Sequence, residues 1–279
     1  MPKSLTPVGV LQLEDWCSLR LSGSDIFDFL HRLSTLDFRT KAPPIRLGAL
    51  LSGRAQLISS GFFEVVGDEV LYTLPESLAE ESLLHLEKFH FAEAVTFSRA
   101  PASCVWIADA SSAKTLLPLA ESSWVTPAVP DLVWLRTSTR SEGWTEGLSH
   151  LAPLSRRVLH AHFLAVGSIL LDLDQVRETL ILEANLDSAV DRNKGCYPGQ
   201  EVVERIFTYG NANKKLIPVS LDKEPSSIPC TLHYDNKEAG VLLACEMSEG
   251  RVGGLAMIHR NYWEKGPLKG DPDLVATIL

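Results

Sequence analysis

Eight consecutive residues, 194–201, constrain the local fold more than any other part of this 279-residue chain. They read Lys-Gly-Cys-Tyr-Pro-Gly-Gln-Glu, with a glycine on each side of Cys-Tyr-Pro. Glycine and proline destabilise the interiors of helices and strands, so we expect a tight turn that displays Cys196. A thiol on such a turn is a candidate for chemistry, because the nearby cations Arg192 and Lys194 would favour the reactive thiolate.

A short helix is expected to follow this turn. Pro198 suits its first position, and Gln200 and Glu201 would then lie in the first helical turn. Cys196 would precede a helix N-terminus, where unpaired backbone N–H groups favour an anion. The alternative is that the glycines serve only the turn and the cysteine fills a gap in the packing, and the residues alone leave both readings open.

The composition limits the classes of protein to consider. The length allows two or three domains or one large one, and 45% hydrophobic and 22% charged residues are typical of a soluble globular protein. The absence of an apolar run of about 18 residues argues against a membrane span or a membrane partner. The N-terminus resembles neither a secretory signal nor an Arg-rich transit peptide, so we expect a cytoplasmic protein. A net charge of -9 argues against direct nucleic-acid binding through a broad basic surface.

The cysteines predict no self-contained metal site. Their number is odd, their spacings are long, and no C-x-x-C pair occurs. In the cytoplasm they should be reduced. Three lie in apolar runs and are expected to be small buried hydrophobes, namely Cys17, Cys104 and Cys245.

The N-terminal half predicts a mixed α+β unit. Periodic apolar residues indicate a helix within 22–36, capped by Ser22 or Ser24. Strands at 62–66 and 69–74 around Gly67-Asp68 are typical of a β-hairpin, and Pro75 would open the next helix. The inner face of that helix is expected at Ala79, Ser82 or Leu83, Leu86 and Phe89.

Further strands are expected at 104–108 and 132–137, and further helices at 113–120 and 156–166. After Gly210, strand-like runs at 216–221, 240–244 and 253–258 alternate with turn-rich stretches, which predicts a small antiparallel barrel or sandwich.

The remaining polar candidates are weaker. His160 and His162 would point about 200° apart on a helix, so they cannot share a ligand there. His85 and His90 are expected to be exposed. Glu183 lies in an apolar run, where a carboxylate occupies either the solvent side of a strand or a site for a polar ligand.

The run 194–201 matches the K-G-C-Y-x-G-Q-E signature of the YgfZ-type folate-binding proteins. These are relatives of the glycine-cleavage T-protein, an aminomethyltransferase, and include mitochondrial iron–sulfur assembly factors. Weaker similarity extends along the chain, at Phe29-Leu30, at Arg205 and Gly210, and at 253–258. By this resemblance the chain is identified as a member of the T-protein superfamily.

The resemblance implies an α+β fold of three domains around a central opening, with a C-terminal antiparallel β-barrel. Residues 1–19 and 100–205 would form the first α+β domain, which carries the signature. Residues 20–99 would form the second α+β domain, and residues 206–279 the barrel.

The resemblance also implies tetrahydrofolate or a derivative in the opening. The implied role is the assembly or maintenance of iron–sulfur clusters in client enzymes, including those that thiolate transfer RNA, and the implied partners are such enzymes or cluster-assembly proteins. Cys196 corresponds to the characteristic cysteine of the family and is the expected functional thiol. The residues expected to bind the cofactor are Glu183, Lys194, Tyr197, Gly199, Gln200, Glu201 and Arg205.

Two departures bear on activity. The T-protein branch has an Asn and a catalytic Asp near the helix after the hairpin, where this chain has Leu74-Pro75. Its E-A-G tripeptide, whose Glu holds the pterin, corresponds here to 165–167, Ala-Val-Gly, so Glu183 is the best acidic candidate for a pterin. The first interpretation is therefore an accessory factor, in which Cys196 makes a transient cluster contact. A folate-dependent one-carbon transferase and a non-catalytic docking module are the alternatives.

Overall fold

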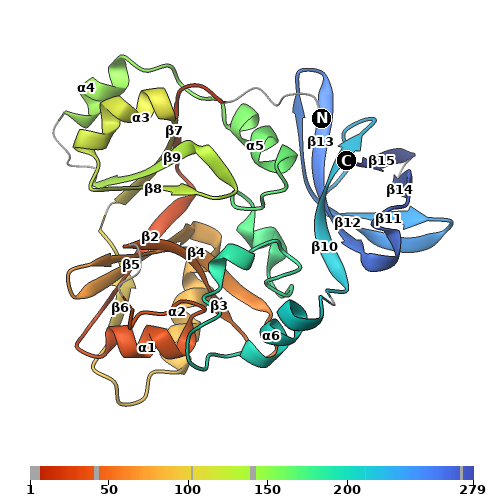
Figure 1. Cartoon of the computed structure of the whole chain (residues 1–279). Helices are drawn as coiled ribbons and strands as arrows, with labels where there is room; N and C mark the ends of the chain where they lie inside the picture. The colour runs from red at the N-terminus through yellow and green to blue at the C-terminus, as the bar shows by residue number, and fades with distance from the viewer. Residues whose placement is uncertain (1–6, 41–43, 102, 139–142, 211, 271–272) are drawn as a thin grey trace.

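The chain folds into three β-sheets, each with its own set of strands (Figure 1). The computed structural model describes residues 7–40, 44–101, 103–138, 143–210, 212–270 and 273–279. Two of the sheets are open and carry helices, and the third closes into a barrel at the C-terminus. This architecture confirms the α+β class and the barrel expected after residue 210.

The first open sheet is antiparallel, with the strand order β3-β4-β5-β2-β6. Its strands are β2 (Trp16–Ser22), β3 (Ile45–Leu51), β4 (Leu57–Val66), β5 (Glu69–Pro75) and β6 (Thr96–Arg99), and it carries the helices α1 (Ile26–Leu33) and α2 (Ala79–Lys88). The predicted hairpin joins β4 to β5, with Gly67 at φ +63°. The predicted inner face of α2 is confirmed, because Ala79, Ser82 and Leu86 are buried.

The predicted serine cap of α1 is wrong. The helix begins at Ile26, and its N-cap residue is Asp25, which makes no side-chain capping bond. The Asp25 carboxylate instead accepts a hydrogen bond from the backbone N–H of Ala94 at 2.7 Å. The helix start is therefore held by a tertiary contact that local sequence does not reveal.

The second open sheet is antiparallel, with the order β1-β7-β9-β8. Its elements are β1 (Val10–Leu13), β7 (Ser103–Asp109), β8 (Ser122–Thr126), β9 (Val129–Ser138), α3 (Ala110–Leu116), α4 (Trp144–Ser149) and α5 (Arg156–Ala165). β7, β9 and α5 match their predicted positions. α3 starts earlier than expected because Asp109 caps it, accepting hydrogen bonds from the N–H groups of Ser111 and Ser112.

The two open sheets share one apolar core. Trp16 of the first sheet lies 5.1 Å from Trp134 of the second, and Phe62 lies 5.0 Å from the same ring. Beside this aromatic core, the guanidinium of Arg136 is buried and pairs with the Glu64 carboxylate at 2.8 Å. An ion pair withdrawn from water in this way fixes the relative position of the sheets.

The barrel closes in the order β10-β13-β12-β11-β14-β15 around a hydrophobic cluster of its own. Its strands are β10 (Lys214–Leu221), β11 (Cys230–Tyr234), β12 (Lys237–Ser248), β13 (Arg251–His259), β14 (Leu268–Gly270) and β15 (Leu274–Ile278). Short 3-10 helices complete the described chain, η1 (Glu76–Leu78), η2 (Leu117–Leu119), η3 (Leu173–Val176), η4 (Asp187–Ala189) and η5 (Arg260–Tyr262).

The signature segment leads into α6 (Gln200–Tyr209), which Figure 1 shows between the first sheet and the barrel. Pro198 precedes this helix rather than opening it, because Gly199 takes the N-cap position in a left-handed conformation. The boundary placed at 205/206 falls inside α6, and the boundary at 19/20 falls inside β2, so the domain limits stay a prediction.

Two expectations about burial are corrected. Cys17, Cys104 and Cys245 are half-buried rather than buried, because each lies on a strand that is only partly covered. His85 and His90 are half-buried rather than exposed. Within the described ranges, no helix is long and apolar enough to cross a bilayer.

Candidate functional site

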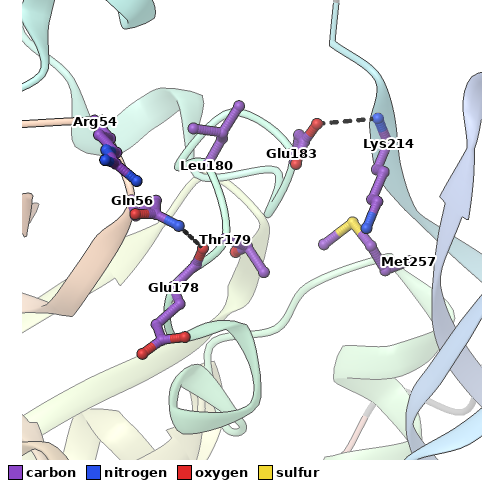
Figure 2. A pocket seen from close by; sticks show the side chains of 8 residues that line it. All are labelled: Arg54, Gln56, Glu178, Thr179, Leu180, Glu183, Lys214 and Met257. Carbon is purple, nitrogen blue, oxygen red and sulfur yellow. Dashed lines mark hydrogen bonds between the residues drawn. The ribbon is translucent and has the colours of Figure 1, made fainter. Parts of the chain in front are cut away.

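A cavity of about 340 Å³ lies where the first sheet, the segment before η4 and the barrel meet (Figure 2). The turn between β3 and β4 contributes two residues, the segment 178–183 contributes four, and the strands β10 and β13 contribute one each. The lining residues are Arg54, Gln56, Glu178, Thr179, Leu180, Glu183, Lys214 and Met257.

Glu183 is the one residue predicted to bind a cofactor that lines this cavity. Its side chain is 7% exposed, and its Oε1 accepts a hydrogen bond from the backbone N–H of Lys214 at 3.1 Å. Its backbone carbonyl accepts a second bond from the N–H of Leu216, which fixes Glu183 to the start of β10. Glu183 thus lies in a turn rather than on the solvent side of a strand, and its role in binding a polar ligand stays a prediction.

The cavity combines both signs of charge. Arg54 and Lys214 supply cations, and Glu178 and Glu183 supply carboxylates (Figure 2). The size falls in the range of small-molecule sites, and a few polar groups on a partly apolar wall are typical of them. A carboxylate can accept the adjacent N–H groups at the edge of a pterin, and cations can pair with the carboxylates of a folate tail. The donor set therefore fits a folate.

The sequence analysis missed the cationic lining residues. Neither Lys214 nor Arg54 belongs to a motif in the sequence that would single it out. Folding brings both residues to the cavity that Glu183 lines. No signal within either segment could have shown this.

The cysteine loop displays two exposed residues, Gly195 and Cys196, between two buried ones. Cys196 is exposed, whereas Lys194 and Tyr197 are each 7% exposed. The Lys194 ammonium donates to the backbone carbonyls of His31 and Ser34, at 2.5 Å each, at the C-terminal end of α1. It also lies 4.9 Å from the centre of the Tyr197 ring. The two buried side chains therefore anchor the loop and leave the thiol at the surface.

Burial changes the acid–base behaviour of both anchors. Desolvation lowers the pKa of Lys194 to about 8, although the carboxylates of Asp191 and Asp37 act in the opposite direction. Desolvation also raises the pKa of Tyr197, and the charge of Glu204 adds to this. Lys194 is therefore poised to lose its proton more readily than an ordinary lysine.

The other cation expected beside the thiol is engaged elsewhere. The Arg192 guanidinium pairs with the Glu204 carboxylate at 3.0 Å and lies 4.4 Å from the centre of the Phe207 ring. Just before it, the Asp191 carboxylate accepts hydrogen bonds from the N–H of Asp37 and the guanidinium of Arg46. These contacts hold residues 191–194 against the rest of the molecule.

A histidine that the sequence analysis did not single out lies behind the loop. His31 is 4% exposed, and a Cβ added at Gly195 would lie 3.2 Å from its Nε2. Its Nδ1 is 3.0 Å from an oxygen of Asp37. Burial, followed by the charge of Lys194, lowers the pKa of His31 and so disfavours the imidazolium.

Gly199 places the cysteine loop directly against the wall of the cavity. Its φ is +81°, and an added Cβ would lie 2.6 Å from the N and Cα atoms of Ala55 and 2.8 Å from the carbonyl oxygen of Ser52. Ala55 separates the cavity residues Arg54 and Gln56. The glycine is therefore needed for close approach as well as for the turn.

The rest of the predicted set lies outside the cavity. Gln200 is half-buried at the start of α6, and Glu201 and Arg205 are exposed on that helix. The structure thus brings the predicted residues into two groups, Glu183 in the cavity and the others in or after the cysteine loop. Among the described residues, no group of three or more His, Cys, Asp and Glu side chains could hold a metal ion.

A second, smaller cavity of about 180 Å³ lies beyond the end of α5. Val166 and Gly167, from the tripeptide that replaces E-A-G, form part of its wall together with Thr126 and Ser168. The Thr126 hydroxyl is buried and makes no hydrogen bond in the described part of the chain.

Comparisons with known proteins find short sequence matches and a similarity of fold. No family model matches the chain. It is 38% identical over 66 residues to a chloroplastic protein of Arabidopsis thaliana named as a putative transferase. It is also 38% identical over 73 residues to the mitochondrial iron–sulfur cluster assembly factor IBA57 of Saccharomyces cerevisiae. These matches cover 24% and 23% of this chain and only 15% of each relative.

A similarity in fold covers nearly the whole chain. The glycine cleavage system aminomethyltransferase T from Bartonella henselae superposes with a TM-score of 0.78 at 13% identity, over 98% of this chain and 86% of that structure. At that identity the likeness shows the fold alone. The chain therefore has the fold of the glycine cleavage aminomethyltransferase T, and short stretches of it are similar to a putative transferase and to an iron–sulfur cluster assembly factor.

Proposed function

We propose that this protein is a cytoplasmic, folate-binding accessory factor for the assembly or maintenance of iron–sulfur clusters, with Cys196 as its functional thiol. The observation that carries the proposal is the display of Cys196. Its side chain is exposed on a loop whose flanking residues, Lys194 and Tyr197, are buried and anchored. A thiol that only filled a gap in the packing would be covered by its neighbours.

Cys196 acts as one transient ligand to a cluster that is cargo. The thiol loses its proton when it binds iron, and three further thiolates complete the usual set of four ligands. The partner supplies those ligands, so the cluster is held at an interface and can be passed on. The clients include iron–sulfur enzymes that thiolate transfer RNA, and the protein acts on RNA only through them. The similarity to the yeast iron–sulfur cluster assembly factor IBA57 supports this role.

The folate occupies the cavity around Glu183. The Glu183 carboxylate accepts the N–H groups of the pterin edge, and the cations Arg54 and Lys214 pair with the glutamate tail at the opposite end. The fold shared with an aminomethyltransferase supports a folate site between the sheets and the barrel. Bound folate would contact three parts of the chain, namely the turn between β3 and β4, the segment 178–183 and the barrel.

Replacement of the thiol tests the proposal. Cys196→Ala alters a surface side chain, so the melting temperature should stay within about 2 °C and the affinity for tetrahydrofolate should not change. Cluster delivery to an apo-[4Fe–4S] acceptor enzyme, followed anaerobically through the activity of the acceptor, should be lost. Cys245→Ala is the matched control, because Cys245 is a half-buried cysteine on the barrel. Full delivery by Cys196→Ala would exclude the proposal.

A further inference from the structure

A single turn lies between the cysteine loop and the cavity. Residues 52–56 connect β3 to β4, and Gly199 packs on the outer side of this turn, against the N and Cα atoms of Ala55. Arg54 and Gln56, on either side of Ala55, face the cavity. One short segment therefore touches both halves of the site.

The turn is closed by its own hydrogen bonds. The backbone N–H of Ser52 donates to the carbonyl of Gln56, and the N–H of Ala55 donates to the carbonyl of Ser52, both at 2.9 Å. The Ser52 hydroxyl accepts further bonds from the N–H groups of Arg54 and Gln56. Ala55 adopts a left-handed φ of +61°, which a non-glycine residue rarely does. These restraints mean that a displacement of Ala55 should move the whole turn rather than Ala55 alone.

The turn is also bonded to the opposite wall of the cavity. Leu57 and the segment 178–179 exchange backbone hydrogen bonds, from the Leu57 N–H to the Thr179 carbonyl at 2.8 Å and from the Glu178 N–H to the Leu57 carbonyl at 2.9 Å. The Gln56 side chain adds a bond from its Nε2 to the Glu178 carbonyl at 3.0 Å (Figure 2). The wall that carries Glu183 thus continues into the turn that supports Gly199.

We infer that the turn 52–56 couples occupancy of the cavity to the mobility of the cysteine loop, with Gly199 as the point of contact. The inference rests on the proposed function and adds a regulation to it. A ligand that contacts Arg54 and Gln56 restrains the turn, and the restrained turn holds Gly199 and the loop that displays Cys196. The coupling is a free energy shared by two sites, so a substitution at Gly199 that loosens the loop and the turn should also weaken binding of the ligand.

Amide hydrogen exchange of the ligand-free protein tests the mechanical half of the inference. Gly199→Ala places a methyl group against Ala55 and should speed exchange in residues 52–57 and 178–180 by about fivefold or more. Gly210→Ala is the matched control, since Gly210 ends the same helix at φ +64° with no atom within 4 Å of an added Cβ. It should leave exchange in those segments within about twofold of the original protein. Equal exchange in the two variants would overturn the inference.

Labelling of the unmodified protein tests whether a bound ligand restrains the cysteine loop. This experiment needs no variant, so it does not depend on whether a variant folds. The rate of alkylation of Cys196 by iodoacetamide is followed by peptide mass spectrometry, with and without saturating tetrahydrofolate. Restraint of the loop should slow labelling of Cys196 about threefold or more, whereas labelling of Cys245 should not change. An unchanged rate at Cys196 with folate bound would overturn the inference.

Calorimetry separates this inference from the proposed function. Gly199→Ala should weaken tetrahydrofolate binding by about fivefold or more, although Gly199 does not line the cavity, and Gly210→Ala should change it by less than about twofold. If the unmodified protein binds no folate, the proposed function fails, and the exchange experiment alone decides whether the turn links the two sites. If folate binds and both variants bind it equally well, the coupling fails and the folate site stands.

Discussion

The buried ammonium of Lys194 should make the stability of this protein rise with pH in a window where most proteins lose stability. The pKa of Lys194 is about 8 in the folded chain, against an ordinary value of 10.5. At pH 7 the side chain is charged in both states, so folding bears the full cost of desolvating the charge. As the pH rises through 8, the folded chain releases the proton while the unfolded chain keeps it, and the cost is relieved.

The size of the effect follows from the two pKa values. Each pKa unit of difference corresponds to 1.36 kcal/mol, so the relief reaches about 3 kcal/mol at high pH and about 2–3 kcal/mol by pH 10. A neutral amine still has two N–H donors, which suffice for the carbonyls of His31 and Ser34. The anchor therefore survives deprotonation.

Lys194→Met is the perturbation that isolates this effect. The variant loses the titrating group and leaves two buried carbonyls without a donor, at a cost of about 1–3 kcal/mol each. At pH 7 the variant no longer has to bury a charged ammonium, and this gain offsets much of that cost. At pH 10 the lysine of the original protein is already largely neutral when folded, so the variant has no such gain. The difference in free energy of unfolding between the original protein and the variant, from urea titrations, should therefore grow by about 2–3 kcal/mol from pH 7 to pH 10. Profiles that stay parallel within about 0.5 kcal/mol would refute the reasoning.

Three further predictions concern Glu183, His160 and the transferase activity. Glu183→Gln removes a charged acceptor from the cavity and should weaken tetrahydrofolate binding about tenfold or more in calorimetry, whereas Glu201→Gln, on the exposed face of α6, should change it less than about twofold. Burial lowers the pKa of His160, but its hydrogen bonds to the carboxylates of Asp172 and Glu246 outweigh burial and raise it. His160→Gln should therefore cost more stability at pH 6 than at pH 8.5 in urea titrations, because the contribution of the imidazolium is complete below the unfolded pKa and is lost as the pH rises through the folded one. The purified protein with tetrahydrofolate and an amine donor should form no methylene-tetrahydrofolate, because the position after the hairpin lacks a carboxylate to activate the amine; steady formation would restore a transferase role.

The sequence predicted elements best where the determinants are local. The Gly67 turn, the apolar spacing of α2 and the glycine-bounded loop at Cys196 each depend on residues a few positions apart. β8 was missed because Ser122–Thr126 is a short edge strand whose residues are mostly not buried, so it shows little apolar pattern. The cap of α1 was misassigned because Asp25 bonds to Ala94, far along the chain.

The candidate site was predicted in part, for a related reason. The residue types around Cys196 indicated a displayed thiol, and the structure exposes it. The direction of Lys194 was not predictable, because a lysine beside a cysteine can turn outward or inward, and here the end of α1 offers carbonyls to it. Likewise, nothing near Gly199 in the sequence reveals that Ala55 lies against it.

The aromatic contacts between the two open sheets bear on how the chain can come apart. Trp16 and Phe62 belong to the first sheet and Trp134 to the second, yet the three rings fill one space, so neither sheet has a complete interior without the other. Excising either sheet would bare several large rings at once, and the remainder would be prone to collapse or aggregate. We therefore expect the two sheets to unfold as a single cooperative unit, so that a substitution in the shared core destabilises both.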